Sequence, residues 1–148
     1  MRKGNEKRIM VVDDDDMNLQ MAEFILKKEM SAEVLLADSG YKCIEMLQKD
    51  AELDLILLDI QMPRMDGIRT LEMIRNHSEW KGIPVIFLTA AADKETVIKA
   101  GQLKVNDYVK KPFMPKDLVE RVNKVLAMKA LDDLDKDVDL AKLLDSMK

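Results

Sequence analysis

Short aliphatic runs alternate along the chain with longer stretches in which apolar residues recur at helical spacing. The runs are short enough for strands, and they occupy residues 8–12, 33–37, 55–58, 84–88 and 107–109. After the first run, Leu19, Ala22 and Leu26 recur at three- and four-residue intervals, as on one face of a helix. A strand followed by a helix, repeated five times, predicts an α/β protein with a parallel sheet and helices on both faces.

The third run, "LILL" at residues 55–58, is apolar without interruption. Central strands of parallel sheets are buried on both faces, so this run is expected in the interior of the sheet. Asp66 and Gly67 mark the start of a helix that runs to about His77, and Pro115 suits the first turn of the last helix. We therefore expect one domain, residues 1–128.

The composition changes after about Met128, which predicts an acidic amphipathic helical tail over residues 129–148. The tail either extends or packs on the last helix, or it serves as a docking or dimerisation element, or it begins a linker to an output domain absent from this chain. Its apolar stripe consists of Leu131, Leu134, Val138, Ala141 and Leu144. Its acids, mostly outside the stripe, are Asp132, Asp133, Asp135, Asp137, Asp139 and Asp145.

Composition and charge exclude several classes of protein. With 47% apolar and 35% charged residues, the chain is typical of a globular protein and not of a disordered one. No apolar run reaches the ~20 residues of a membrane span and no signal-peptide core is present, so we expect a cytoplasmic protein. A single cysteine, Cys43, can form neither an internal disulfide nor a thiolate zinc site. The net charge of -4 gives no support to direct nucleic-acid binding.

Polar residues follow most of the predicted strands. "DDDD" at residues 13–16 follows the first strand, and Asp59, Thr89 and Lys111 follow or nearly follow the third, fourth and fifth. Ligands of open parallel sheets bind beyond these strand ends. If the first and third strands are neighbours, Asp13, Asp14 and Asp59 converge and repel one another unless a cation intervenes, and a hard divalent ion such as Mg²⁺ suits them.

The "DDDD" run has two other interpretations. Asp15 and Asp16 are expected to cap the following helix, where carboxylates interact favourably with the helix dipole. A calcium loop beginning at Asp14 is excluded, because Leu19 stands where the loop needs glycine and Ile25 where it needs a bidentate glutamate.

With a metal present, Asp59 becomes a candidate nucleophile toward a phosphoryl group. Lys111 could balance the charge of the phosphoryl oxygens, and Thr89 could donate a hydrogen bond to one of them. Each of these residues alone also has an ordinary explanation: a loop-capping acid, a strand-terminal threonine and a surface lysine. Their joint position after successive strands favours a common site.

At this point the chain resembles the receiver domain of response regulators in two-component signalling, similar to single-domain chemotaxis regulators. The resemblance rests on "VVDD" (11–14), "LLDIQMPRMDG" (57–67), "LTA" (88–90) and "YVKKPF" (108–113), and it covers about residues 7–128. It implies a flavodoxin-like, doubly wound, five-stranded parallel sheet of order 2-1-3-4-5. It also implies a cis bond between Lys111 and Pro112, which X-Pro chemistry permits.

The resemblance also implies a role for each site residue. Asp59 is the phosphoacceptor and, with Thr89 and Lys111, forms the catalytic set. Mg²⁺ is held by the carboxylates of Asp13, Asp14 and Asp59 and the backbone carbonyl of Gln61. Thr89 and Tyr108 are the switch residues, although Tyr108 could equally be a sheet-edge residue with a solvated hydroxyl. The sequence departs from the family's pattern at "LKVNDY" (103–108), which lacks a Gly-Ala pair, and has Ala91 two residues beyond Thr89.

The expected function is a phosphorylation-dependent signalling switch. A phosphohistidine of a histidine kinase or histidine phosphotransfer protein donates to Asp59, and the altered surface changes binding to a downstream protein target. Such a protein catalyses only its own phosphoryl transfer and dephosphorylation and is not a turnover enzyme. A homodimer through the last helices or the tail is a further expectation, whereas nucleic-acid and membrane partners are not expected.

There are three alternatives to this function. The chain could be the receiver half of a longer regulator whose output domain is absent, or an interaction module that takes no phosphate. The intact set of Asp13, Asp14, Asp59, Thr89 and Lys111 argues against the latter. A haloacid-dehalogenase-like phosphatase would need a second acid two residues after its nucleophile, where this chain has Gln61.

Overall fold

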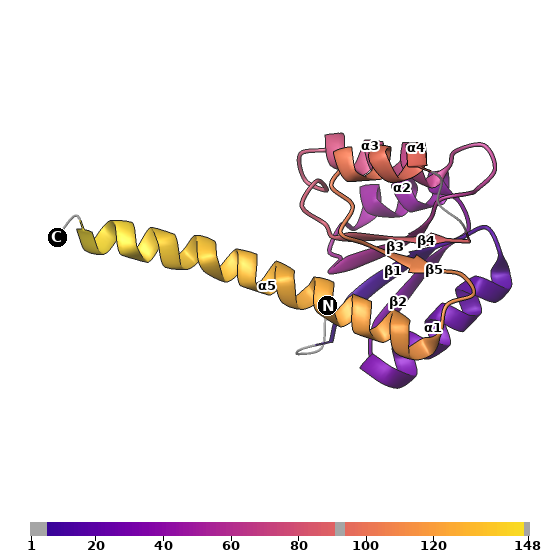
Figure 1. The fold of residues 1–148 in the computed structure, drawn as a ribbon, viewed down its shortest axis with the longest axis horizontal. Helices are drawn as coiled ribbons and strands as arrows, with labels where there is room; N and C mark the ends of the chain where they lie inside the picture. Colours follow the sequence, from indigo (N-terminus) through magenta and orange to yellow (C-terminus); the bar gives the residue numbers. More distant parts are fainter. Residues whose placement is uncertain (1–5, 91–93, 147–148) are drawn as a thin grey trace.

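Five parallel strands form a single sheet in the order β2-β1-β3-β4-β5 (Figure 1). The computed structural model describes residues 6–90 and 94–146, with the backbone alone for 135–146. The strands are β1 (Arg8–Val12), β2 (Glu33–Ala37), β3 (Leu55–Asp59), β4 (Val85–Thr89) and β5 (Asp107–Lys110). The helices are α1 (Asp16–Met30), α2 (Gly40–Lys49), α3 (Gly67–Asn76), α4 (Lys94–Gln102) and α5 (Pro115–Ser146). The predicted fold class and strand order are therefore confirmed, and the Lys111–Pro112 bond is cis, as the resemblance implied.

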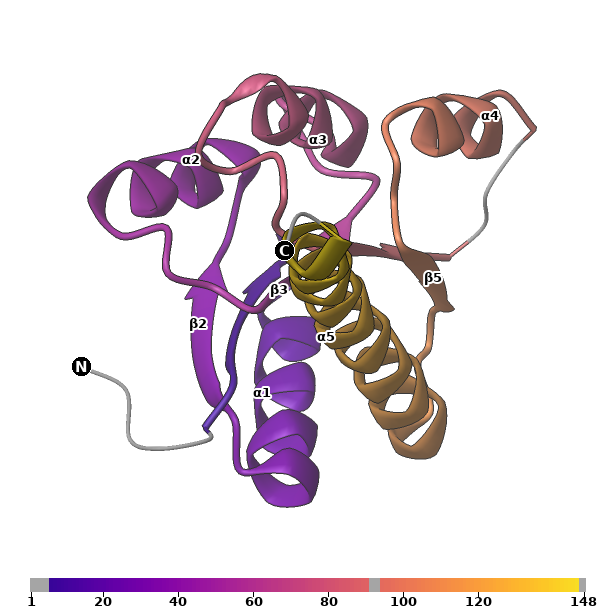
Figure 2. The ribbon, with the colours of Figure 1, turned by 90° about the vertical axis from the view of Figure 1, so that its left-hand side faces the viewer.

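Helices cover both faces of the sheet, with α2, α3 and α4 on one face and α1 and α5 on the other (Figures 1 and 2). Successive residues of β3 point to opposite faces: Ile56 and Leu58 join the core under α2 and α3, and Leu55 and Leu57 join the core under α1 and α5. All four are fully buried, which explains the uninterrupted apolar run of this strand.

Local side chains fix the helix starts as the sequence predicted. The Asp15 carboxylate caps α1 by accepting a hydrogen bond from the Met17 N–H at 2.9 Å, and Asp16 lies in the first turn. Asp66 caps α3 in the same way through the Arg69 N–H. On α2, Cys43 is fully buried and burial raises its pKa to about 12, so its thiol stays protonated and inert.

The last helix changes its apolar face where it leaves the domain. Leu118, Val122 and Val125 are buried against the sheet, whereas Leu131 and Leu134 are 58% and 56% exposed. At about 100° per residue, Leu131 and Leu134 lie on the side of α5 opposite the buried stripe. Residues 129–146 thus continue α5 away from the domain (Figure 1); the side chains of Val138, Ala141 and Leu144 lie outside the described residues. None of the described helices combines the length and the apolar composition needed to span a bilayer.

Arg75, near the end of α3, joins two loops at the edge of the sheet where β4 and β5 begin. Its guanidinium donates to backbone carbonyls of the α3–β4 loop and of the α4–β5 turn, and to one side-chain amide. The acceptors are the carbonyls of Leu103 (2.9 Å), Lys81 (3.1 Å), Ile83 (2.8 Å) and Lys104 (3.1 Å) and Oδ1 of Asn106 (3.3 Å). All five N–H groups are used, so Arg75 acts as a structural clamp.

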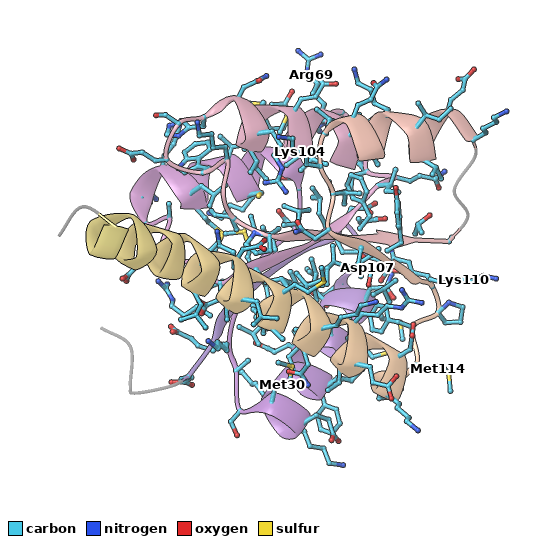
Figure 3. The ribbon with its side chains drawn as sticks, turned by 60° about the vertical axis from the view of Figure 1, so that its left-hand side comes forward. Met30, Arg69, Lys104, Asp107, Lys110 and Met114 are labelled. Carbon is cyan, nitrogen blue, oxygen red and sulfur yellow. The ribbon has the colours of Figure 1, made fainter. Side chains whose placement is uncertain are left out.

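Replacing Arg75 by Met is expected to lower the free energy of unfolding by about 3 kcal/mol, because partly buried carbonyls lose their donor. The matched control is Arg69→Met on the same helix, since Arg69 projects into solvent (Figure 3) and should change stability by less than about 0.5 kcal/mol. Urea unfolding followed by circular dichroism measures both values. Equal stabilities of the two variants would contradict the clamp.

Candidate functional site

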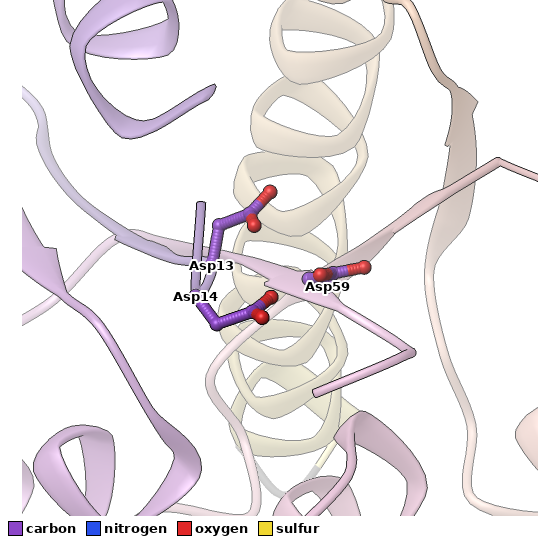
Figure 4. A group of neighbouring side chains, drawn as sticks. All are labelled: Asp13, Asp14 and Asp59. Carbon is purple, nitrogen blue, oxygen red and sulfur yellow. The ribbon is translucent and has the colours of Figure 1, made fainter. Parts of the chain in front are cut away.

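The carboxyl ends of β1, β3, β4 and β5 meet at one edge of the sheet because all strands are parallel. Oxygen atoms of Asp13, Asp14 and Asp59 lie within 4.8 Å of one another there (Figure 4). These acids line a cavity of about 220 Å³. Its other lining residues are Asp15, Asn18, Ile60, Gln61, Thr89, Ala90 and Lys111. The structure therefore brings together every predicted metal and catalytic residue.

Backbone contacts hold Asp59 at this edge. It is the last residue of β3, which is buried along its whole length, and the Gln61 N–H donates to Asp59 Oδ1 at 3.3 Å. The next residue, Ile60, donates its N–H to the Leu88 carbonyl at 3.2 Å and accepts from the Gly67 N–H at 2.7 Å. The chain thus turns sharply after the acid while remaining bonded to β4 and to the start of α3.

Lys111 bridges the two buried acids. Its Nζ lies 2.7 Å from Asp13 Oδ2 and 3.2 Å from Asp59 Oδ1, and the Asp13 and Asp59 residues are 0% and 5% exposed. Burial alone would lower the pKa of Lys111, but its bond to Asp13 and the charge of Asp59 outweigh burial and raise that pKa. Lys111 therefore stays charged.

The pKa of Asp59 is raised to about 6, first by burial and then by the charge of Asp13, against which Lys111 acts only in part. Three carboxylates beside one ammonium leave a surplus of negative charge. This surplus, presented by hard oxygen donors in a solvent-accessible cavity, fits a divalent cation such as Mg²⁺.

Thr89 and Tyr108 lie on the β4–β5 side of the site. Thr89 ends β4, is 8% exposed and lines the acidic cavity. Tyr108 does not line that cavity, but with Thr89 it lines an adjoining hollow of about 480 Å³. Its ring packs at 44° to Phe87, with centroids 6.3 Å apart, and its hydroxyl donates to the Val97 carbonyl of α4 at 3.4 Å. Tyr108 is therefore placed between Thr89 and α4.

Two further predicted features are only partly described. Gln61 lines the cavity and its N–H contacts Asp59, whereas its carbonyl as a metal ligand remains a prediction. Ala91 lies outside the described residues. The structure also adds Asn18, which was not among the predicted site residues; in the sequence it matched only an early ligand position of the excluded calcium loop.

Comparisons with known proteins agree with this geometry. A family model described as the response regulator receiver domain matches residues 9–123. Chemotaxis protein CheY1 of Helicobacter pylori is 33% identical over 80% of this chain and 96% of its own length. Hybrid signal transduction histidine kinase D of Dictyostelium discoideum is 38% identical over 84% of this chain, which spans only 8% of that protein.

Solved structures match as well. A CheY-like response regulator receiver domain protein from Methanospirillum hungatei superposes with a TM-score of 0.80 at 28% identity, over 86% of this chain and 99% of its own. Chemotaxis protein CheY4 of Vibrio cholerae gives a TM-score of 0.76 at 28% identity, over 81% of this chain and 98% of its own.

Proposed function

Since the chain belongs to the response-regulator receiver family of two-component signalling, we propose that it is a switch in which Asp59 accepts a phosphoryl group from a phosphohistidine donor. The observation that carries this proposal is the position of the Asp59 carboxylate, held between the Lys111 ammonium at 3.2 Å and the acids Asp13 and Asp14.

The contacts that fix the Asp59 carboxylate are made by Oδ1, which receives the Gln61 N–H and faces Lys111. Oδ2 is therefore the oxygen that attacks phosphorus. A bond forms between Oδ2 and phosphorus as the phosphorus–nitrogen bond of the donor breaks, and the leaving imidazole keeps the electron pair and takes up a proton.

The charges around Asp59 indicate the roles of the neighbouring groups. Asp13, Asp14 and Asp59, with the Gln61 carbonyl, would hold Mg²⁺, whose chemistry here is neutralisation of the transferring phosphoryl oxygens. Lys111 is released from Asp59 Oδ1 as that carboxylate becomes an acyl phosphate, and its ammonium can then bind a phosphoryl oxygen. The Thr89 hydroxyl supplies a second hydrogen bond.

The proposed conformational change uses the hollow that Thr89 and Tyr108 both line. Movement of Thr89 toward the phosphoryl group frees space for the Tyr108 ring, which gives up the Val97 carbonyl and alters the surface formed by α4, β5 and α5. This change controls binding to a downstream protein. The donor is a histidine kinase or a histidine phosphotransfer protein of the cytoplasm, and the chain catalyses only its own phosphorylation and dephosphorylation.

The proposed switch suits both a longer regulator and a single-domain protein. The matching segment of the Dictyostelium discoideum relative is a small part of a longer protein, whereas this chain matches the Helicobacter pylori relative over nearly its whole length. In a longer regulator the altered surface acts on an attached domain, and in a single-domain protein it acts on a separate target or a second copy bound through the last helices or the tail.

To test the proposal, the protein is incubated with acetyl phosphate and Mg²⁺ and analysed by intact mass spectrometry. We expect addition of one phosphoryl group, which does not occur when Mg²⁺ is chelated before the donor is added and does not occur in Asp59→Asn. The matched control, Asp38→Asn, changes an exposed acid that follows β2 and does not line the cavity, and it should be modified like the wild type. Equal modification of Asp59→Asn would overturn the assignment.

A further inference from the structure

Asn18 lines the acidic cavity without a fixed role in the fold. Its side chain is half-buried in the first turn of α1, and it makes no side-chain hydrogen bond to any residue within the described part of the chain. By contrast, Gln20 in the same helix is exposed, does not line the cavity, and donates to Asp16 Oδ2 at 2.8 Å. A partly buried carboxamide with free donor and acceptor capacity is available to a ligand.

The geometry of a helix start directs this carboxamide toward the acids. Side chains of an α-helix lean toward its N-terminus, and for α1 that end lies at the cavity. Asp15, the N-cap of α1, lines the same cavity and precedes Asn18 by three residues. Asp14, the exposed member of the acidic cluster, lines the cavity together with Asn18.

The ligands offered by the chain leave the ion incompletely surrounded. Mg²⁺ demands octahedral coordination and usually retains several waters. The carboxylates of Asp13, Asp14 and Asp59 and one backbone carbonyl cannot fill six positions with one atom each. Groups that bind the retained waters orient them and strengthen metal binding.

We propose that the Asn18 carboxamide hydrogen-bonds a water in the coordination shell of the divalent cation and thereby raises the affinity of the site. This inference rests on the proposed function, because that function supplies the cation. The Asn18 side-chain oxygen accepts a hydrogen bond from the bound water, and its NH₂ group can donate to the exposed Asp14 carboxylate. Asn18 is thus a positioning residue and not a direct ligand.

The test is calorimetric titration of the full chain with Mg²⁺ in the absence of any phosphodonor. Asn18→Leu should raise the dissociation constant about tenfold, the lower limit for loss of a group that orients a metal-bound ligand. Asn18→Asp keeps the acceptor and adds a negative charge, so it should lower the constant below that of the wild type. Gln20→Leu, the matched control on α1, should leave the constant unchanged.

Circular dichroism establishes that each variant is folded, and leucine favours a helix more than asparagine does. If Asn18→Leu binds Mg²⁺ like the wild type, or if Asn18→Asp weakens binding as Asn18→Leu does, the role of Asn18 is overturned while the acidic site stands. If the wild type itself binds no Mg²⁺, the proposed function fails together with the inference.

Discussion

The Asp59→Asn variant is expected to be more stable than the wild type at pH 7.5 without Mg²⁺, by on the order of 2 kcal/mol. The pKa of Asp59 is raised from 3.8 to about 6 in the folded protein, because burial and the charge of Asp13 disfavour its ionised form. A shift of this size corresponds to roughly 3 kcal/mol, which we discount because the cavity is open to solvent. The residue proposed to carry the function therefore destabilises the metal-free fold.

Because folding raises the pKa of Asp59, the difference in stability between Asp59→Asn and the wild type depends on pH. Below pH 4 the carboxyl group is protonated in both the folded and the unfolded states, so its ionisation does not lower the free energy of unfolding. Between about pH 4 and 6 the unfolded chain loses the proton and the folded chain retains it, so the wild type loses stability as the pH rises. The difference between variant and wild type should therefore be small at pH 4, grow to pH 6 and stay constant above it.

Urea unfolding at a series of pH values, with and without Mg²⁺, measures this difference. The cation should stabilise the wild type more than Asp59→Asn, because it neutralises the charge that the variant lacks. Asp38→Asn serves as the control, since Asp38 is exposed and does not line the cavity. A difference that is independent of pH, or an Asp59→Asn variant less stable than the wild type at pH 7.5, would contradict the account.

The sequence predicted those site residues that follow a strand directly. In a parallel sheet every strand delivers its last residue to the same edge, so Asp13, Asp59 and Thr89 converge once the strands are recognised. The two-sided burial of β3 was also visible, because a strand buried on both faces needs apolar residues at consecutive positions.

Residues whose roles depend on how a helix or loop is placed were not predictable in this way. Asn18 reaches the cavity because of the position of α1, which no local pattern specifies. Arg75 donates mainly to carbonyl groups, and since every residue carries a carbonyl, the sequence near Leu103 and Lys104 gives no sign of the contact. The apolar stripe of the tail was predicted, but only the phase of α5 shows that Leu131 and Leu134 face away from the domain.

Gly67→Ala should lower the free energy of unfolding by about 3 kcal/mol and slow phosphorylation of Asp59. A Cβ atom at Gly67 would collide with the carbonyl oxygen of Asp59 and lie 2.7 Å from Cα of Ile60. Both neighbours are backbone atoms, and Ile60 is bonded on one side to Leu88 and on the other to Gly67 itself. The clash cannot be relieved by a rotamer change, so β3 must shift at its functional end.

The control for this variant is Gly101→Ala, because a Cβ atom at Gly101 meets nothing within 4 Å and the residue lies in α4. That change should stabilise the protein by about 0.5 to 1 kcal/mol through helix propensity alone. Urea unfolding and the rate of modification by acetyl phosphate measure both variants. If Gly67→Ala were as stable as Gly101→Ala and were phosphorylated at the same rate, the end of β3 would be free to move. A loss of both in Gly67→Ala alone would mean that the glycine is required because the start of α3 packs directly on the backbone that presents Asp59.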